Sequence, residues 1–219
     1  MKVLIVGANG QVGKHLVKMI QQSETITAKA MIRKTEQAKF FEDLNAETIV
    51  VDLEDETKKI TEAAKDVDAV VFTAGSGPST GPDKTMLIDL DGAVKTIEAT
   101  KDAGVNRFIM ISSFETDRKA IQEAVNNAPS FAPYVVAKHY ADDWLRKTDL
   151  EYTIIHPGLL TNNEATGQVE AAETVERNEI PREDVAEVIL ACLENEATIK
   201  KEFQVVSGEH SIKEAIQSL

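Results

Sequence analysis

The stretch Val3-Leu4-Ile5-Val6-Gly7-Ala8-Asn9-Gly10-Gln11-Val12-Gly13 joins an apolar run to an amphipathic one through a turn rich in glycine. The apolar run predicts a strand at Lys2–Val6 that is buried on both faces. The segment that follows, Gln11–Gln22, has apolar residues at helical spacing. A strand, a tight turn and a helix in this order predict the first βα unit of an open parallel sheet.

Each glycine of this turn has a different predicted task. Gly7 permits the tight turn, Gly10 lets a ligand approach the backbone, and Gly13 lets the helix pack closely on the strand. Free N–H groups and the positive end of the helix dipole then face a bound phosphate, even though the spacing is G-x-x-G-x-x-G rather than G-x-G-x-x-G. The turn therefore predicts a dinucleotide site, with contacts from Gly7, Asn9, Gly10, Gln11 and Val12.

Outward from this turn, short β-branched runs alternate with longer amphipathic ones, which predicts βα units on a parallel sheet. The predicted strands are Lys2–Val6, Thr27–Ile32, Thr48–Val51, Ala69–Thr73, Phe108–Ile111, Tyr152–Ile155 and Phe203–Val206. The predicted helices are Gln11–Gln22, Glu36–Leu44, Glu54–Ala64, Lys84–Ala103, Tyr134–Lys147, Arg182–Glu194 and a short one at Ile212–Leu219. We expect an α/β fold of the Rossmann type, a doubly wound parallel sheet of about seven strands in the order 3-2-1-4-5-6-7 flanked by helices.

Two stretches, Phe114–Pro133 and Leu160–Ile180, fit this alternation poorly. Each follows a predicted strand on the side where open α/β sheets bind ligands, so both are candidates for segments that cover a substrate. Ordinary surface loops are the alternative. The chain is predicted to form one NAD(P)-binding domain, 1–219, with a coenzyme-binding core at 1–157 and a small substrate-covering lid at 158–219.

The end of the second predicted strand bears on the choice of dinucleotide. Sites specific for NAD place an acidic residue there, whereas this strand ends in Arg33, whose guanidinium can bind the 2′-phosphate of NADP through two hydrogen bonds. Arg33 therefore favours NADP, with NAD possible and a merely solvated charge as the alternative. Asp52, with Leu53 beside it, could accept a hydrogen bond from the adenine amino group or cap the helix that begins near Glu54.

A tyrosine and a lysine lie four residues apart in Tyr134-Val135-Val136-Ala137-Lys138, on one face of a predicted helix. A free tyrosine is a poor acid or base at neutral pH, and a neighbouring lysine would lower its pKa. The pair follows both the glycine turn and a strand that ends in Ser112-Ser113. Tyr134 is therefore a candidate acid/base, with a surface or packing tyrosine as the alternative.

Several motifs now stand in one order along the chain, and their arrangement resembles the short-chain dehydrogenase/reductase superfamily over nearly the whole length. They are Gly7–Gly13, Thr73-Ala74-Gly75, Ser112-Ser113, Tyr134 with Lys138, His156-Pro157-Gly158 and Arg182-Glu183-Asp184-Val185-Ala186. The spacing of the first turn and the Pro-Gly after the sixth strand resemble the atypical and extended branch. That branch includes epimerase/dehydratase-like, NmrA-like and flavin-reductase-like proteins.

This resemblance implies roles for particular residues. Tyr134 would be the general acid/base, Lys138 would bind the nicotinamide ribose and Ser113 would hold the substrate oxygen. The implied coenzyme contacts beyond the first turn are Ala74, Gly75, Ser112, Lys138, Pro157, Gly158 and Leu159.

Composition excludes several other classes of function. A net charge of -13, from 37 acidic and 24 basic residues, disfavours nucleic acids and membrane surfaces as partners. The single cysteine, Cys192, lies in an apolar run and is expected to be a packed thiol, and the four histidines lack the spacing of metal ligands. Without an apolar run of about 20 residues or a cleavable leader, the chain is expected in the cytoplasm.

These observations lead first to an NADP-dependent oxidoreductase that acts on a small carbonyl, hydroxyl, quinone-like or flavin-like substrate. The alternatives are a sugar-nucleotide epimerase or dehydratase, and a non-catalytic NADP(H) sensor that binds a protein partner. Either a monomer or a homodimer is compatible with the sequence.

Overall fold

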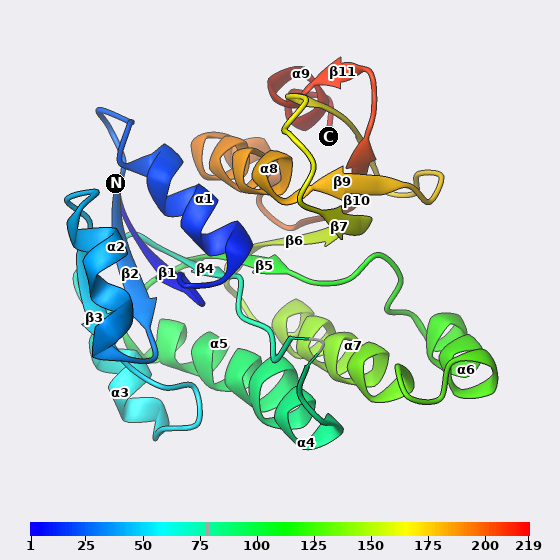
Figure 1. Cartoon of the computed structure of the whole chain (residues 1–219), viewed down its shortest axis with the longest axis horizontal. Helices are drawn as coiled ribbons and strands as arrows, with labels where there is room; N and C mark the ends of the chain where they lie inside the picture. The colour runs from blue at the N-terminus through cyan, green and yellow to red at the C-terminus, as the bar shows by residue number, and fades with distance from the viewer. Residues whose placement is uncertain (78) are drawn as a thin grey trace.

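The computed structural model describes residues 1–77 and 79–219. Over these residues, nine strands form one sheet in the order β11-β8-β10-β6-β5-β4-β1-β2-β3. The predicted strands appear in it as β1 (Lys2–Val6), β2 (Thr27–Ile32), β3 (Glu47–Val50), β4 (Ala69–Phe72), β5 (Arg107–Ile111), β6 (Glu151–Pro157) and β10 (Lys201–Ser207). These strands are parallel and follow the predicted order, so the doubly wound Rossmann-type sheet is confirmed (Figure 1).

The helices lie where the periodicity predicts them, with somewhat different ends. They are α1 (Gln11–Ile20), α2 (Ala38–Glu42) after a 3₁₀ turn at Thr35–Gln37, α3 (Thr57–Ala63), α7 (Ala132–Arg146), α8 (Arg182–Glu194) and α9 (Ile212–Gln217). The long helix predicted at Lys84–Ala103 is instead divided into α4 (Pro82–Lys84), a π-helical segment η2 (Thr85–Gly92) and α5 (Ala93–Asp102). A π-helix is rare and is frequently found at functional sites.

Helices cover both faces of the sheet and enclose two apolar cores (Figure 1). Helices α1 and α8 pack together over one face, whereas α3, α5 and α7 cover the other. Alternate residues of β1 serve the two sides, because Val3 and Ile5 belong to the first core and Leu4 and Val6 to the second. Burial of each such aliphatic side chain stabilises the fold by about 1.5–3 kcal/mol.

The two stretches that fit the alternation poorly contain regular structure that the sequence pattern does not predict. Leu160–Ile180 overlaps β7 (Leu159–Thr161), β8 (Gln168–Ala172) and β9 (Glu179–Pro181). Strand β8 pairs antiparallel with β10 and with β11 (His210–Ser211), while β7 and β9 form a small separate sheet. Phe114–Pro133 contains α6 (Arg118–Asn127), which is capped by the side chain of Asp117. The prediction of about seven strands was therefore low, since these short strands depend on partners that are distant in the sequence.

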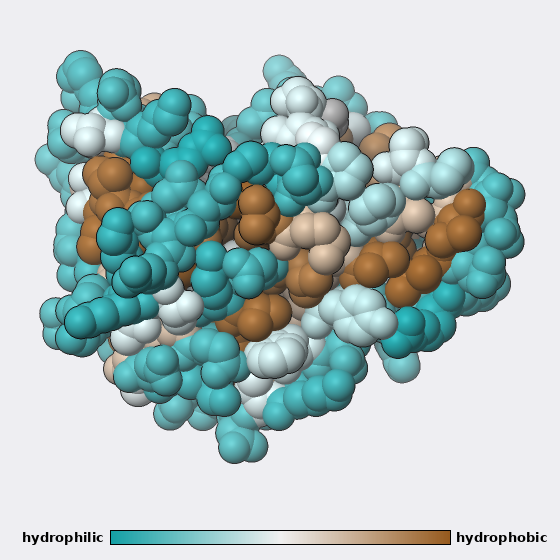
Figure 2. Space-filling model, turned by 90° about the horizontal axis from the view of Figure 1, so that it is seen from below, coloured by the Kyte–Doolittle hydropathy of each residue, from teal (hydrophilic) through white to brown (hydrophobic). Residues whose placement is uncertain are grey.

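The parallel strands bring the turns after β1, β4, β5 and β6 to one edge of the sheet, where ligands of such sheets bind. Seen from the side of α3 to α7, the surface is mainly hydrophilic, with hydrophobic side chains exposed at several places (Figure 2). Met86, Leu87, Val125 and Phe131 are among the exposed apolar residues of these elements. The chain is still predicted to be a single domain and either a monomer or a homodimer.

Candidate functional site

The turn after β1 has the shape that its glycines predict. Gly7 has φ +84°, in the left-handed region, and its carbonyl accepts a hydrogen bond from the N–H of Gly10 at 2.9 Å. A Cβ at Gly13 would stand 2.7 Å from the carbonyl oxygens of Gly7 and Ala8, so only glycine lets α1 begin this close to the turn. Gly10 precedes α1 and, within the described part of the chain, no side chain caps this helix. Its first N–H groups are therefore available to an anion.

A cleft of about 360 Å³ opens beside this turn, between the ends of β1, β2, β3 and β4. It is lined by eight of the predicted coenzyme contacts, which are Gly7, Asn9, Gly10, Arg33, Asp52, Leu53, Ala74 and Gly75. Gln11 and Val12 lie in the first turn of α1, beside the cleft but outside its lining. Its volume is within the range of small-molecule sites.

The side chain of Gln37, which lines the cleft, fixes the backbone at Arg33 and Lys34. Gln37 Oε1 accepts hydrogen bonds from the N–H groups of Arg33 and Lys34, at 2.9 and 3.1 Å. Arg33 is exposed and makes no ion pair with any residue that the structure describes. Its guanidinium is therefore not engaged in an ion pair within the described residues.

Asp52 lines the cleft, but it does not cap a helix. Its Oδ1 accepts the N–H of Glu54 at 3.0 Å, whereas α3 begins at Thr57 with Glu56 in the cap position. Of the two roles open to Asp52, the helix cap is excluded because the chain makes a turn before the helix starts. Contact with adenine remains a prediction for Asp52.

Lys84 and Glu54, which both line the cleft, form an ion pair that the sequence does not predict. Lys84 Nζ contacts both carboxylate oxygens of Glu54, at 2.6 and 2.7 Å, and both residues line the cleft. Glu54 follows β3 and Lys84 ends α4, so the pair joins the segments after two different strands. No local pattern could have indicated a pair separated by 30 residues.

The predicted Tyr134 and Lys138 lie on the same face of α7. Lys138 is buried, donates to the carbonyl of Ile111 at 3.2 Å, and has its Nζ 3.7 Å from Asp89 Oδ1 and 5.8 Å from the ring centre of Tyr134. Burial lowers the pKa of Lys138, but Tyr134, Asp89 and Asp142 together outweigh this, so the pKa lies above its ordinary value. Lys138 is therefore a buried cation beside a half-buried phenol that also packs against Phe131 at 5.0 Å between ring centres.

The two predicted serines are positioned differently. Ser112 is buried, and its Oγ donates to Asp142 Oδ2 of α7 at 2.6 Å. Its hydroxyl thus faces the helix, so any contact with a coenzyme would come through its backbone. Ser113 is half-buried, and its carbonyl binds Nδ1 of His156. The hydroxyl of Ser113 makes no hydrogen bond with the described part of the chain, which leaves it as the candidate for a substrate contact.

The segment that begins at Ser112 is held by side chains from α7 and β10, in addition to His156 of β6. Thr116 Oγ1 donates to Asp142 Oδ2 at 2.9 Å, and the carbonyl of Thr116 pairs with His139 Nδ1 at 2.6 Å. The side chain of Gln204, on β10, donates to the carbonyl of Phe114 at 3.1 Å. The first part of the predicted substrate-covering stretch is therefore anchored to α7 and to the sheet.

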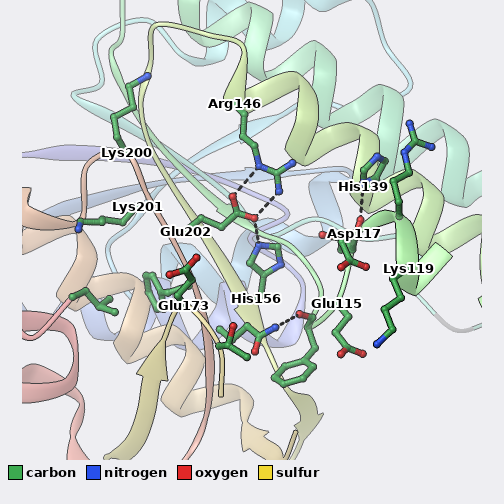
Figure 3. A pocket seen from close by; sticks show the side chains of 17 residues that line it. Glu115, Asp117, Lys119, His139, Arg146, His156, Glu173, Lys200, Lys201 and Glu202 are labelled. Carbon is green, nitrogen blue, oxygen red and sulfur yellow. Dashed lines mark hydrogen bonds and ion pairs between the residues drawn. The ribbon is translucent and has the colours of Figure 1, made fainter. Parts of the chain in front are cut away.

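His156, at the end of β6, is the centre of an ion cluster (Figure 3). Its Nε2 lies 2.7 Å from Glu202 Oε1, and Glu202 also binds Arg146 through two contacts at 2.6 and 2.8 Å. Both partners of the ring, the Ser113 carbonyl and the Glu202 carboxylate, only accept hydrogen bonds, so the ring must carry both protons. Burial opposes this charge, but Glu202 and Asp142 raise the pKa of His156 above its ordinary value. Burial opposes the charge of Glu202 as well, yet its hydrogen bonds to Arg146 and His156 lower its pKa to about 2.

This ion cluster lines a second hollow of about 1030 Å³, which also reaches Glu115, Glu173 and Lys201 (Figure 3). As far as the described residues go, the hollow and the cleft share no lining residue. The segment after β5, which carries Ser113, forms part of the wall of the hollow. The ion cluster therefore supports that segment through the contact of His156 with the Ser113 carbonyl.

The predicted Pro157-Gly158-Leu159 has a structural reason for its glycine. A Cβ at Gly158 would stand 2.1 Å from the carbonyl oxygen of Asn178, so the chain before β9 passes too closely for any other residue. Leu159 also donates its N–H to that carbonyl, at 3.1 Å, and its side chain is 68% exposed. Proximity to nicotinamide remains a prediction for these three residues.

Two further observations concern metals and membranes. Among residues 1–77 and 79–219, no group of three or more His, Cys, Asp or Glu side chains could hold a metal ion. In the same ranges, no helix has the length and apolar character needed to cross a membrane. Cys192 is buried, which raises the pKa of its thiol to about 12 and makes it inert at neutral pH.

Comparisons with known proteins agree with this geometry. The family model described as NAD(P)H-binding matches residues 7–196. An uncharacterized sugar epimerase of Bacillus subtilis, YhfK, is 46% identical over the full length of both chains. The oxidoreductase ylbE from Lactococcus lactis has a structure with a TM-score of 0.89 at 32% identity, covering 100% of this chain and 96% of its own. A yeast protein, YMR090W, is 34% identical and covers 100% of this chain and 99% of its own.

Proposed function

Because this chain belongs to the NAD(P)H-binding family of epimerase-like and reductase-like proteins, we propose that it is an NADP-dependent oxidoreductase of the short-chain dehydrogenase/reductase type. Its substrate is a small carbonyl or hydroxyl compound, or a quinone-like or flavin-like one. The observation that carries the proposal is the pair formed by buried Lys138 and half-buried Tyr134 at the edge of the sheet that also holds the Gly7 cleft.

The residues of the cleft fit a dinucleotide. The turn from Gly7 to Gly13 offers uncapped N–H groups to the pyrophosphate, and the close contacts of Gly7 and Gly13 leave no room for side chains. Arg33 lines the cleft, and the ability of its guanidinium to pair with a 2′-phosphate supports NADP rather than NAD. When bound, the coenzyme would supply or accept a hydride at its nicotinamide ring.

The chain's own residues would manage the proton. In the reductive direction, Tyr134 donates its phenolic proton to the carbonyl oxygen of the substrate, whose carbon receives the hydride. Lys138 stabilises the phenolate left behind, since its charge is held within reach of the ring by Ile111 and Asp89. The hydroxyl of Ser113 would hold the substrate oxygen for this transfer.

A turnover assay tests the proposal. The protein is mixed with NADPH and a panel of small carbonyls, quinones and flavins, and NADPH consumption is followed by absorbance. We expect consumption with at least one class of acceptor. Binding of NADPH without turnover on any acceptor tried would favour the sensor over the enzyme.

Epimerisation or dehydration of a sugar nucleotide is a second candidate, favoured by the 46% identity to the sugar epimerase YhfK. In such reactions the coenzyme is regenerated in each cycle, so the two candidates differ in a measurable way. An epimerase or dehydratase would convert a sugar nucleotide without net consumption of NADPH, and product analysis by NMR would show this.

A further inference from the structure

Asp89, in the π-helical segment η2, is a buried carboxylate with one oxygen unused. Its side chain is 1% exposed, and its Oδ2 accepts the N–H of Ser76 at 3.0 Å. Its Oδ1 has no hydrogen-bond partner anywhere in residues 1–77 and 79–219. An unsatisfied acceptor at this depth is costly, and more so when it is charged. Almost none of its surface is accessible, so a ligand in the cleft reaches this oxygen only if the chain at Gly75 and Ser76 shifts.

The position of this oxygen relates it to the coenzyme cleft. It lies beside Gly75, 3.2 Å from where a Cβ of that residue would stand, and both Gly75 and Ser76 line the cleft. On its other side is Lys138 Nζ at 3.7 Å, which forms an ion pair with Oδ1 but lies beyond hydrogen-bond distance. The oxygen therefore lies between the cleft lining and the lysine predicted to bind a ribose.

The surroundings select the chemistry of the missing partner. A phosphate or carboxylate would be repelled by the charge of Asp89, and a second cation would be repelled by Lys138. A neutral hydroxyl satisfies both neighbours, because it can donate to a carboxylate oxygen and accept from an ammonium group. Of the parts of a dinucleotide, the sugar hydroxyls have this character.

We propose that Asp89 is a coenzyme-binding residue, whose Oδ1 accepts a hydrogen bond from a hydroxyl of the ribose attached to nicotinamide while Lys138 donates to the same sugar. This inference rests on the proposed function, since it requires a nicotinamide dinucleotide in the cleft. In this proposal the π-helical segment η2 positions the Asp89 carboxylate for the sugar, behind Gly75 and Ser76.

Two ligands that differ in this ribose test the proposal. NADP⁺ contains it, whereas adenosine 2′,5′-bisphosphate contains only the adenosine half. Calorimetric titration of Asp89→Ala should show NADP⁺ binding weakened by about tenfold or more, the loss expected for a hydrogen bond to a charged group, with the bisphosphate within about twofold of wild type. Asp89→Asn keeps a neutral acceptor of the same shape, so its affinity for NADP⁺ should lie between those of the wild type and Asp89→Ala.

Asp142→Asn is the matched control. Asp142 is also a buried carboxylate near Lys138 with an oxygen that lacks a partner in the described residues, but its other oxygen binds Ser112 and Thr116. Loss of its charge should leave the ratio of the two affinities unchanged. A similar change in this ratio for Asp142→Asn and Asp89→Asn would mean that charge near Lys138, rather than contact with Asp89, sets the affinity.

The remaining outcomes separate the two proposals. If the wild-type protein binds neither NADP⁺ nor the bisphosphate, and binds neither NAD⁺ nor 5′-ADP, the proposed function fails. If the wild type binds both and the Asp89 variants leave their ratio unchanged, only the role of Asp89 is overturned, and water is then the partner of Oδ1. Binding of the bisphosphate also shows that each variant is folded. If Asp89→Ala does not fold, the affinities of Asp89→Asn decide whether Asp89 contacts the coenzyme.

Discussion

The turn after β1 and the segment after β5 lie at the same edge of the sheet but are built in different ways. The first is shaped mainly by its backbone, through the left-handed Gly7 and the close approach allowed by Gly13, with one long side-chain contact from Thr73 Oγ1 to the Gly7 carbonyl at 3.4 Å. The second is held by side chains that come from α7, β6 and β10. The first should therefore be sensitive to any added side chain, whereas the second should be sensitive to the loss of particular polar groups.

The largest effect is expected where side chains perform the chemistry. Tyr134→Phe removes the proposed proton donor but keeps the ring that packs against Phe131, so turnover should fall by ~10²–10⁴-fold with coenzyme affinity nearly unchanged. Lys138→Met should lower both turnover and affinity. Steady-state kinetics and fluorescence titration with NADPH measure the two quantities.

If Tyr134→Phe has no effect but the protein still reduces flavins, the proton-transfer role is wrong and the oxidoreductase remains. No effect together with no turnover on any acceptor would reject the enzyme for the acceptors tried.

The next prediction concerns the part built from backbone. A side chain at Gly10 would meet only the Gly7 carbonyl, at 3.1 Å, so Gly10→Val should fold and yet block the approach of the pyrophosphate. We expect NADPH binding to be lost, as measured by fluorescence titration, with the melting temperature close to that of wild type. Gly7→Val is the contrasting variant, because its Cβ would stand 2.6 Å from the Ala74 backbone and should disrupt folding as well. Unchanged affinity in Gly10→Val would show that the turn does not hold phosphate.

The ion cluster behind Ser113 should make stability depend on pH. The pKa of His156 is raised above its ordinary 6.5 in the folded chain, so its contribution is complete below pH 6.5 and disappears as the pH rises through the folded value. The pKa of Glu202 is lowered from 4.5 to about 2, so its contribution is present above pH 4.5 and is lost as the pH falls toward 2. His156→Gln should therefore cost about 1–3 kcal/mol near pH 5.5 and less at alkaline pH.

Urea unfolding at several pH values measures this dependence. His210→Gln, which changes an exposed histidine, is the control and should show no such trend. A cost for His156→Gln that stayed constant from pH 5.5 to alkaline pH would contradict a charged His156.

The smallest effect tests the choice of coenzyme. Arg33→Asp should weaken NADPH by at least about tenfold, or about 1.4 kcal/mol, and leave NADH much less affected. Gln37 would still hold the backbone at this position, so the change should be confined to charge. Calorimetry with both coenzymes measures it, and equal weakening of the two would remove Arg33 as the discriminating residue.

The same contrast explains what could be predicted from the sequence. The bounds of α8 follow from local periodicity, and the order of the parallel strands follows from the Rossmann-type alternation of strands and helices. The turn at Gly7 is also local, so its shape could be predicted from its glycines.

Long-range pairing could not be predicted in this way. Strand β8 has only five residues, too few for their alternation to predict it, and it pairs with β10 and β11. Asp89 and His156 were missed as site residues, although each is a polar residue inside an apolar run, in Met86-Leu87-Ile88-Asp89-Leu90 and in Ile154-Ile155-His156. That placement was the available signal, but only the fold shows what each residue contacts.

The anchoring of the segment after β5 has a consequence for synthesis of the chain on the ribosome. The turn at Gly7 is followed directly by its helix α1, whereas the carbonyl of Phe114 must wait for Gln204, 90 residues later. His156 likewise waits for Glu202, 46 residues beyond it. A nascent chain that has made both Tyr134 and Lys138 therefore still lacks the supports of Ser113. The proposed catalytic end of the site is finished only when β10, almost the last element to be translated, joins the sheet.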